Sequence, residues 1–128
     1  MIKLILLKRT FESGQVIFQE GDPGSEAYLI RTGYVAISKT DGTRNVELAT
    51  RGPGEVMGEM ALIDDKPRSA TVIAKTKVEA EIVTRADLKD MLSHVPEQLV
   101  TILHQILFRL RDANEMAASY AAQNQSND

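Results

Sequence analysis

The placement of glycine divides this sequence into two parts that favour different secondary structure. All 8 glycines lie at or before Gly58, and 3 of the 4 prolines lie at or before Pro67. Short apolar segments alternate with these turn residues, which is typical of an antiparallel sheet with tight connections. Asp41-Gly42 suits a two-residue hairpin, because glycine adopts positive φ without strain and aspartate tolerates it. Strands are predicted at residues 15–18, 27–30, 34–37, 46–48, 70–74 and 78–83, with residues 1–9 as a further strand or a short lead-in.

The last third of the sequence has the pattern of two helices. Thr84 precedes Asp87 by three residues, as in a capping box, and predicts a short helix through Leu92. Pro96 suits the first position of a second helix, which we expect to continue to about residue 122. Apolar residues recur along it at three- and four-residue steps, at Leu99, Leu103, Ile106, Leu107 and Leu110. This stripe favours packing against the β part, with a partner helix as the alternative.

Together these patterns predict one α+β domain, mainly β, over residues 1–128. We expect an antiparallel sandwich or barrel over about 3–83, followed by the two helices over about 85–122.

Composition excludes several function classes. Without cysteine the chain has no disulfide, thiol nucleophile or thiolate metal ligand. Its net charge of −3 argues against a broad nucleic-acid surface. No apolar run is long enough for a signal-peptide core or a membrane span, so we expect a cytoplasmic protein. His94 and His104 lack partners for a metal set or a catalytic triad, and the sequence predicts no enzyme activity.

One segment departs from the rhythm of strands and turns. Gly58 allows a sharp bend, and residues 59–63 suit one short helical turn whose first N–H groups form an anion site. Arg68 then brings a permanent cation whose planar donor fork fits phosphate oxygens. Ser69 adds a hydroxyl donor, and Ala70 leaves its own N–H accessible beside a small side chain. The segment therefore predicts binding of a phosphate group.

Glu59 changes the nature of the expected ligand. A carboxylate beside a bound anion is repulsive unless it accepts hydrogen bonds from hydroxyl groups, and a ribose supplies such hydroxyls. Taken alone, Glu59 and Arg68 would each be read as an exposed surface charge. Their common setting indicates a phosphorylated sugar instead.

The same segment closely resembles the phosphate-binding cassette of the cyclic nucleotide-binding domain family. That family includes bacterial catabolite-activator-like regulators, regulatory subunits of protein kinase A and cyclic-nucleotide-gated channels. The cassette match consists of residues 58–62 (Gly-Glu-Met-Ala-Leu) and 67–72 (Pro-Arg-Ser-Ala-Thr-Val). Further matches, in the family's order, are residues 14–24, 28–35 and 52–55.

The resemblance implies that the β part is an antiparallel β-roll or jelly-roll sandwich, and it implies a role for each cassette residue. Glu59 would accept a hydrogen bond from the ribose 2′-hydroxyl, and Arg68 would pair with the exocyclic phosphate oxygens. The phosphate would also receive hydrogen bonds from the Ser69 hydroxyl and from backbone N–H groups. The residues carried over as cassette ligands are Gly58, Glu59, Met60 or Ala61, Arg68, Ser69 and Ala70.

In the family the last long helix acts as a lid over the base. Here Leu107 or Leu110 would cover the base, and Arg109 would stack on it or remain an exposed charge. Serine at position 69 resembles cAMP-binding members, so we expect cAMP as ligand, with cGMP as the alternative. No metal or other cofactor is expected.

Two other function classes remain to be weighed. A cupin enzyme needs clustered histidines on its strands, and the β part has none. A degenerate module that only dimerises or docks an effector protein through its last helix would be expected to lose Arg68, which is present. The sequence ends too soon after Leu110 for a DNA-reading domain, so we expect a free-standing sensor or a domain of a channel, kinase or transporter.

Overall fold

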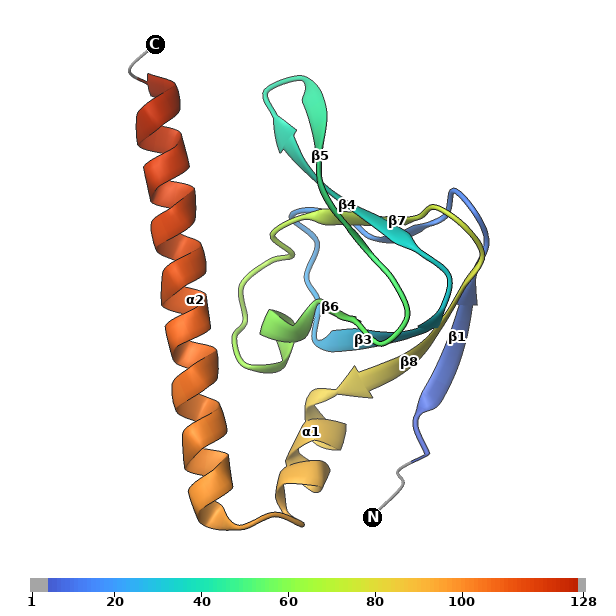
Figure 1. Cartoon of the computed structure of the whole chain (residues 1–128), viewed down its shortest axis with the longest axis vertical. Helices are drawn as coiled ribbons and strands as arrows, with labels where there is room; N and C mark the ends of the chain where they lie inside the picture. The colour runs from blue at the N-terminus through green and yellow to red at the C-terminus, as the bar shows by residue number, and fades with distance from the viewer. Residues whose placement is uncertain (1–4, 127–128) are drawn as a thin grey trace. The chain divides into compact units, whose positions relative to one another are not determined.

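The computed structural model describes residues 5–126, except for the side chains of residue 111 and residues 114–126. Two compact units are distinguished, one extending to Leu88 and the other beginning at Lys89. The first unit contains all the strands, and the second is helical (Figure 1).

The first unit consists of two four-stranded sheets in which every neighbouring pair is antiparallel. This arrangement confirms the predicted mainly-β antiparallel roll. One sheet has the order β1 (Leu7–Phe11), β8 (Val78–Thr84), β3 (Glu26–Thr32) and β6 (Val56–Met57). The other has the order β2 (Val16–Phe18), β7 (Thr71–Ala74), β4 (Val35–Asp41) and β5 (Arg44–Arg51).

The hydrophobic core is built from strand residues. In β8 the alternation of apolar and acidic residues places Val78, Ala80 and Ile82 in the core, while Glu81 forms an ion pair with Arg31. The buried members of the core cluster are Phe11, Tyr28, Ile30, Val35, Met57, Val72, Ala74, Val78, Ala80 and Ile82.

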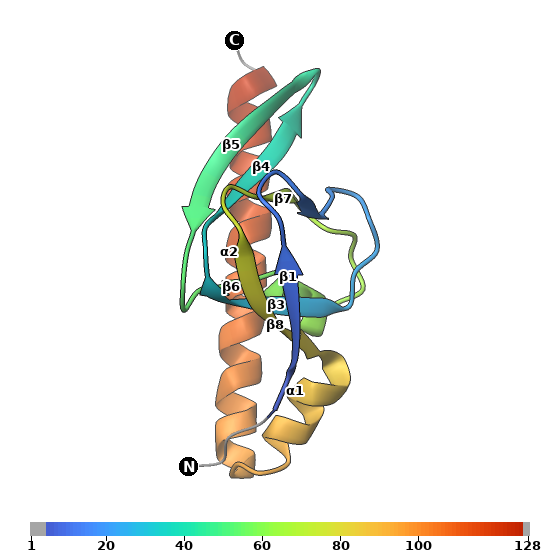
Figure 2. The same ribbon diagram turned by 90° about the vertical axis from the view of Figure 1, so that its right-hand side faces the viewer.

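The predicted two-residue hairpin forms, but one position later than expected: Asp41 is the last residue of β4, and Gly42 and Thr43 form the loop. Asp41 pairs with Arg44 across the turn, and Gly42 has φ +65°, the left-handed conformation that this turn requires. Figure 2 shows the β4–β5 hairpin extending beyond the rest of the roll.

Two strands were incompletely anticipated. β1 continues to Phe11, two residues past the predicted lead-in. β6 was missed altogether, because its two residues, which pair with Tyr28 and Leu29, are too few to show a periodic pattern.

Both predicted helices are present. α1 (Arg85–Leu92) begins with the expected capping box, in which Thr84 N–H donates to Asp87 Oδ2 (2.9 Å) and Asp87 N–H donates to Thr84 Oγ1 (3.1 Å). α2 (Glu97–Ser126) extends beyond the predicted end near residue 122. Pro96 immediately precedes α2 instead of being its first residue, since its carbonyl accepts the N–H groups of Leu99 and Val100.

Apolar side chains of α2 are exposed at Leu99, Ile102, Leu103, Ile106, Phe108 and Leu110. No helix in the described part of the chain is both long and apolar enough to cross a membrane.

Candidate functional site

The expected helical turn forms directly after β6. It is the 3₁₀ helix η1 (Glu59–Leu62), and it follows Gly58, whose φ of 72° lies in the left-handed region. Ala61 N–H donates to Gly58 O (3.2 Å), and the N–H groups of Ile63 and Asp64 donate to Met60 O (3.1 Å each). The glycine therefore turns the chain out of the sheet and into the short helix.

Arg68 is buried beside this turn, with only 8% of its surface exposed. Its Nη2 donates to Glu26 O (2.8 Å), and its Nη1 donates more weakly to Gly58 O (3.4 Å). The guanidinium carbon lies 4.2 Å from the centre of the Phe18 ring, in a cation–π arrangement. Arg68 Nε is buried and has no hydrogen-bond partner among the described residues.

Two glycines make room for the guanidinium. A Cβ atom at Gly24 would overlap Nε and Cζ of Arg68, and a Cβ at Gly58 would lie 2.5 Å from Nη1. The Gly58 Cβ would also come within 3.3 Å of the Phe18 ring. The Arg68 side chain thus occupies a space that only glycine leaves open on both sides.

The backbone of Arg68 is tied to the turn that follows β2. Gly21 N–H donates to Arg68 O, and Arg68 N–H donates to Asp22 O, both at 2.8 Å. Close by, Glu20 N–H donates to Thr71 Oγ1 (3.0 Å). These hydrogen bonds fix the backbone position from which the Arg68 side chain projects.

The charge of Arg68 is not balanced by a carboxylate. Its hydrogen bonds go to carbonyl oxygens, and no ion pair joins it to an acidic residue of the described chain. The Glu26 carboxylate binds the Tyr28 hydroxyl (2.6 Å) and Arg9 (3.4 Å) instead. Burial and the bond to Glu26 raise the pKa of Tyr28 to about 12. Buried charges are normally paired, and within the described residues Arg68 departs from that rule.

The structure brings the predicted cassette residues together only in part. Arg68 directly contacts Gly58, so the two ends of the predicted cassette meet. Ala61 is buried, Glu59, Met60 and Ala70 are half-buried, and Ser69 is exposed. Arg109 lies in the second unit, on α2, with its side chain exposed. The ligand roles of all these residues, including the lid role of Arg109, stay predictions.

Sequence reasoning missed the residues that surround Arg68. Gly24 was included only in the matching segment 14–24, and Phe18 was otherwise assigned only to a strand. The role of Glu26 depends on its backbone carbonyl, which every residue possesses, so no sequence signal identifies it.

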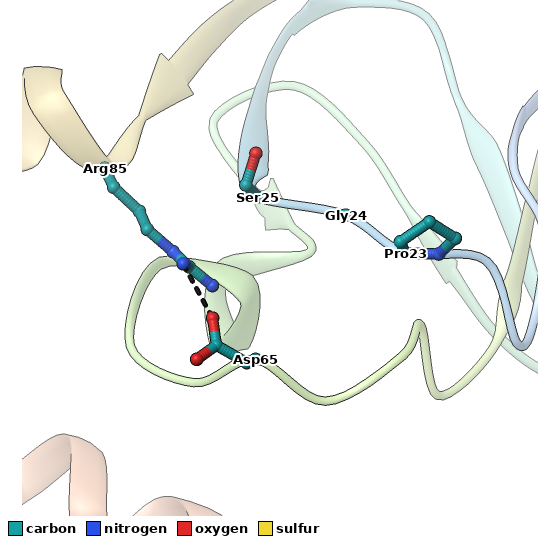
Figure 3. A pocket seen from close by; sticks show the side chains of 5 residues that line it. All are labelled: Pro23, Gly24, Ser25, Asp65 and Arg85. Carbon is teal, nitrogen blue, oxygen red and sulfur yellow. Dashed lines mark ion pairs between the residues drawn. The ribbon is translucent and has the colours of Figure 1, made fainter.

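Arg85 was also missed. Figure 3 shows it paired with Asp65, and Arg85 Nη1 lies 2.8 Å from Asp65 Oδ1. Both residues line a pocket of about 290 Å³. Pro23, Gly24 and Ser25 complete the lining of this pocket. In the described residues, no group of three His, Cys, Asp or Glu side chains is placed to hold a metal ion.

Comparison with known proteins adds independent findings. The family model described as "Cyclic nucleotide-binding domain" matches residues 8–95. The Cyclic AMP receptor protein of Thermus thermophilus is 33% identical over 108 residues, which are 84% of this chain and 50% of that protein. The chain therefore spans about half the length of this curated relative.

Solved structures are similar in fold. A structure of the EAL enzyme Bd1971 in its halfsite-occupied form superposes with a TM-score of 0.78 and 36% identity, covering 86% of this chain and 99% of that one. Its cAMP-bound form (TM-score 0.69, 37% identity) and its cGMP-bound form (0.71, 35%) cover 85% and 88% of this chain, and 30% of the other chain in both cases.

Proposed function

This chain belongs to the cyclic nucleotide-binding domain family, and we propose that it is a regulatory, non-catalytic module that binds a cyclic nucleotide, with cAMP as the preferred ligand. The observation that carries the proposal is the buried Arg68, whose charge has no acidic partner among the described residues and whose Nε has no acceptor there. A cyclic phosphate supplies both the negative charge and the acceptor oxygens.

In this proposal the cassette holds the sugar and the phosphate. Arg68 pairs with the exocyclic oxygens, and the Ser69 hydroxyl and Ala70 N–H donate to the same group. Of the two candidate amides on η1, Met60 is the better donor, because Ala61 N–H already donates to Gly58 O. Glu59 accepts a hydrogen bond from the ribose 2′-hydroxyl.

The base is proposed to be covered by α2. Leu107 or Leu110 would supply apolar contact, and Arg109 would stack on the base. The nucleotide would bind the closed position of α2 more tightly than the open one, and so raise the population of the closed state. A partner protein would recognise that state. cAMP and cGMP forms of a structural relative both exist, so the preference for cAMP depends on Ser69.

A second candidate function is supported by the exposed apolar side chains on α2, such as Ile102 and Ile106. A module of the same fold that binds no nucleotide would use this helix to dimerise or to dock an effector protein. It would leave the charge of Arg68 without a counter-ion, so we favour nucleotide binding.

The test is a calorimetric titration of the purified chain with cAMP, cGMP and linear 5′-AMP. We expect saturable binding of cAMP, weaker binding of cGMP and little binding of AMP. Glu59→Gln should weaken cAMP binding, while Arg44→Gln, at the exposed tip of the β4–β5 hairpin, serves as a control. A folded chain that binds neither cyclic nucleotide would refute the proposal and favour the docking module.

A further inference from the structure

Arg85 makes three contacts with the segment that runs from η1 towards Arg68. Its Nε donates to Ala61 O (2.9 Å), and its Nη2 donates to Asp64 O. Its Nη1 forms the ion pair with Asp65 (2.8 Å) that Figure 3 shows. One planar guanidinium thus holds the end of the 3₁₀ turn and the two acidic residues that follow it.

The position of Arg85 is itself fixed by the fold. It is the first residue of α1, directly after Thr84, whose capping bonds with Asp87 determine the start of the helix. Thr84 also pairs with Glu26 across the sheet. Glu26 is the residue whose carbonyl binds Arg68. Both arginines are therefore anchored to the same strand pair.

The two arginines hold opposite ends of one short turn. Arg68 binds the carbonyl of Gly58, just before η1, and Arg85 binds the carbonyl of Ala61, within its last turn. A 3₁₀ turn of four residues has few internal bonds, so its conformation depends on contacts from outside. Met60, whose N–H is proposed above as a phosphate donor, lies in the sequence between Gly58 and Ala61, whose carbonyls the two arginines bind.

We propose that Arg85 is a positioning residue of the nucleotide site: it holds the cassette turn in the conformation that binds the phosphate, without touching the ligand. The expected effect of Arg85 on nucleotide affinity rests on the proposed function. Its stabilisation of the η1 turn does not depend on that function. The two carbonyl bonds are its main contribution, because 91% of the Asp65 side chain is exposed and an exposed ion pair stabilises little.

The experiment compares the full chain with Arg85→Gln, Arg85→Lys and Asp65→Asn. Glutamine is too short to span the two carbonyls, lysine keeps the charge but has no planar fork, and the Asp65 variant removes only the ion pair. Arg44→Gln is the matched control for loss of an exposed arginine. Each protein is examined by amide hydrogen exchange without ligand and by calorimetric titration with cAMP.

We expect Arg85→Gln to speed exchange across residues 59–64 while the core amides of β3 and β8 keep their protection. Its cAMP affinity should fall about tenfold, the equivalent of one lost charge-assisted hydrogen bond. Arg85→Lys should recover part of this loss, and Asp65→Asn and Arg44→Gln should bind within about twofold of the parent.

Unchanged exchange in residues 59–64 of Arg85→Gln would overturn the inference, as would faster exchange accompanied by parental affinity. Failure of the parent chain to bind cAMP would instead refute the proposed function, and the exchange result would still decide whether Arg85 holds the turn. Loss of protection throughout β3 and β8 would show a general structural role and would also count against the inference.

Discussion

A methyl group at Gly24 would test whether the guanidinium of Arg68 occupies the position described. Gly24 does not have the positive φ of Gly58, so alanine causes no backbone strain there. Its Cβ would overlap Nε and Cζ of Arg68. Since the guanidinium is buried, Gly24→Ala should force it out of its contacts with Glu26 O and Phe18.

The cost follows from those contacts. A hydrogen bond from a charged donor contributes about 1.5–3 kcal/mol, and a desolvated cation–π contact contributes about 1–2 kcal/mol. Replacing glycine with alanine stabilises the folded state by about 0.4–1 kcal/mol, because it lowers the conformational entropy of the unfolded chain. We therefore expect Gly24→Ala to lower the free energy of unfolding by about 3 kcal/mol. With Arg68→Ala already present, the overlap disappears, and the same change should be neutral or stabilising by about 0.4–1 kcal/mol.

Urea unfolding of the parent, the two single variants and the double variant measures this coupling. For a slope of about 1–3 kcal/mol per molar urea, a loss of about 3 kcal/mol moves the midpoint by roughly 1–3 M. Equal costs of Gly24→Ala in both backgrounds would show that the methyl group does not meet Arg68, and would refute the reasoning. The same proteins titrated with cAMP should show that Gly24→Ala weakens binding.

Two further predictions concern groups around the site. The pKa of Tyr28 is raised to about 12 in the folded protein, against about 10 in the unfolded chain. The neutral phenol therefore stabilises the fold fully below about pH 10, by on the order of 2 kcal/mol. This stabilisation is lost as the pH rises towards 12. Urea unfolding from pH 9 to 12 should therefore be less pH-dependent in Tyr28→Phe, and identical profiles would contradict the assignment. Thr84→Ala removes the hydroxyl that caps α1 and should destabilise the protein by about 1 kcal/mol, as measured by the urea midpoint, while an unchanged midpoint would show that the capping box contributes nothing.

Local patterns in the sequence predicted much of the fold because each depends on a few neighbouring residues. Gly42 specified the turn between β4 and β5 to within one residue, and Thr84 with Asp87 specified the start of α1. Both signals act through conformational preferences within four residues. β6 has no such signal, since its pairing with β3 is set by long-range contacts across the sheet. The extent of α2 was underestimated because its polar end has no apolar stripe to mark it.

The candidate site shows the same division between local and distant causes. Gly58 and the η1 turn follow from adjacent residues, so the sequence predicted them. The burial of Arg68 depends on a carbonyl 42 residues away and on a ring from another strand, and neither partner has an identifying side-chain pattern. Sequence reasoning therefore predicted a ligand contact for Arg68 but not its packing, and for the same reason it did not detect the hold of Arg85 on Ala61.

The partners of Arg68 also bear on how an anion would be bound. Carbonyl oxygens and an aromatic ring stabilise a guanidinium without neutralising it, whereas a carboxylate partner would have to be displaced or repelled by an incoming phosphate. Nε already lacks an acceptor among the described residues, and the bond from Nη1 to Gly58 O is long at 3.4 Å. Because Nε is buried against Gly24, a phosphate can accept a hydrogen bond from it only after the guanidinium or the Gly24 backbone moves. On this reasoning a phosphate has no carboxylate to displace from Arg68, but part of the binding free energy is spent on exposing the guanidinium.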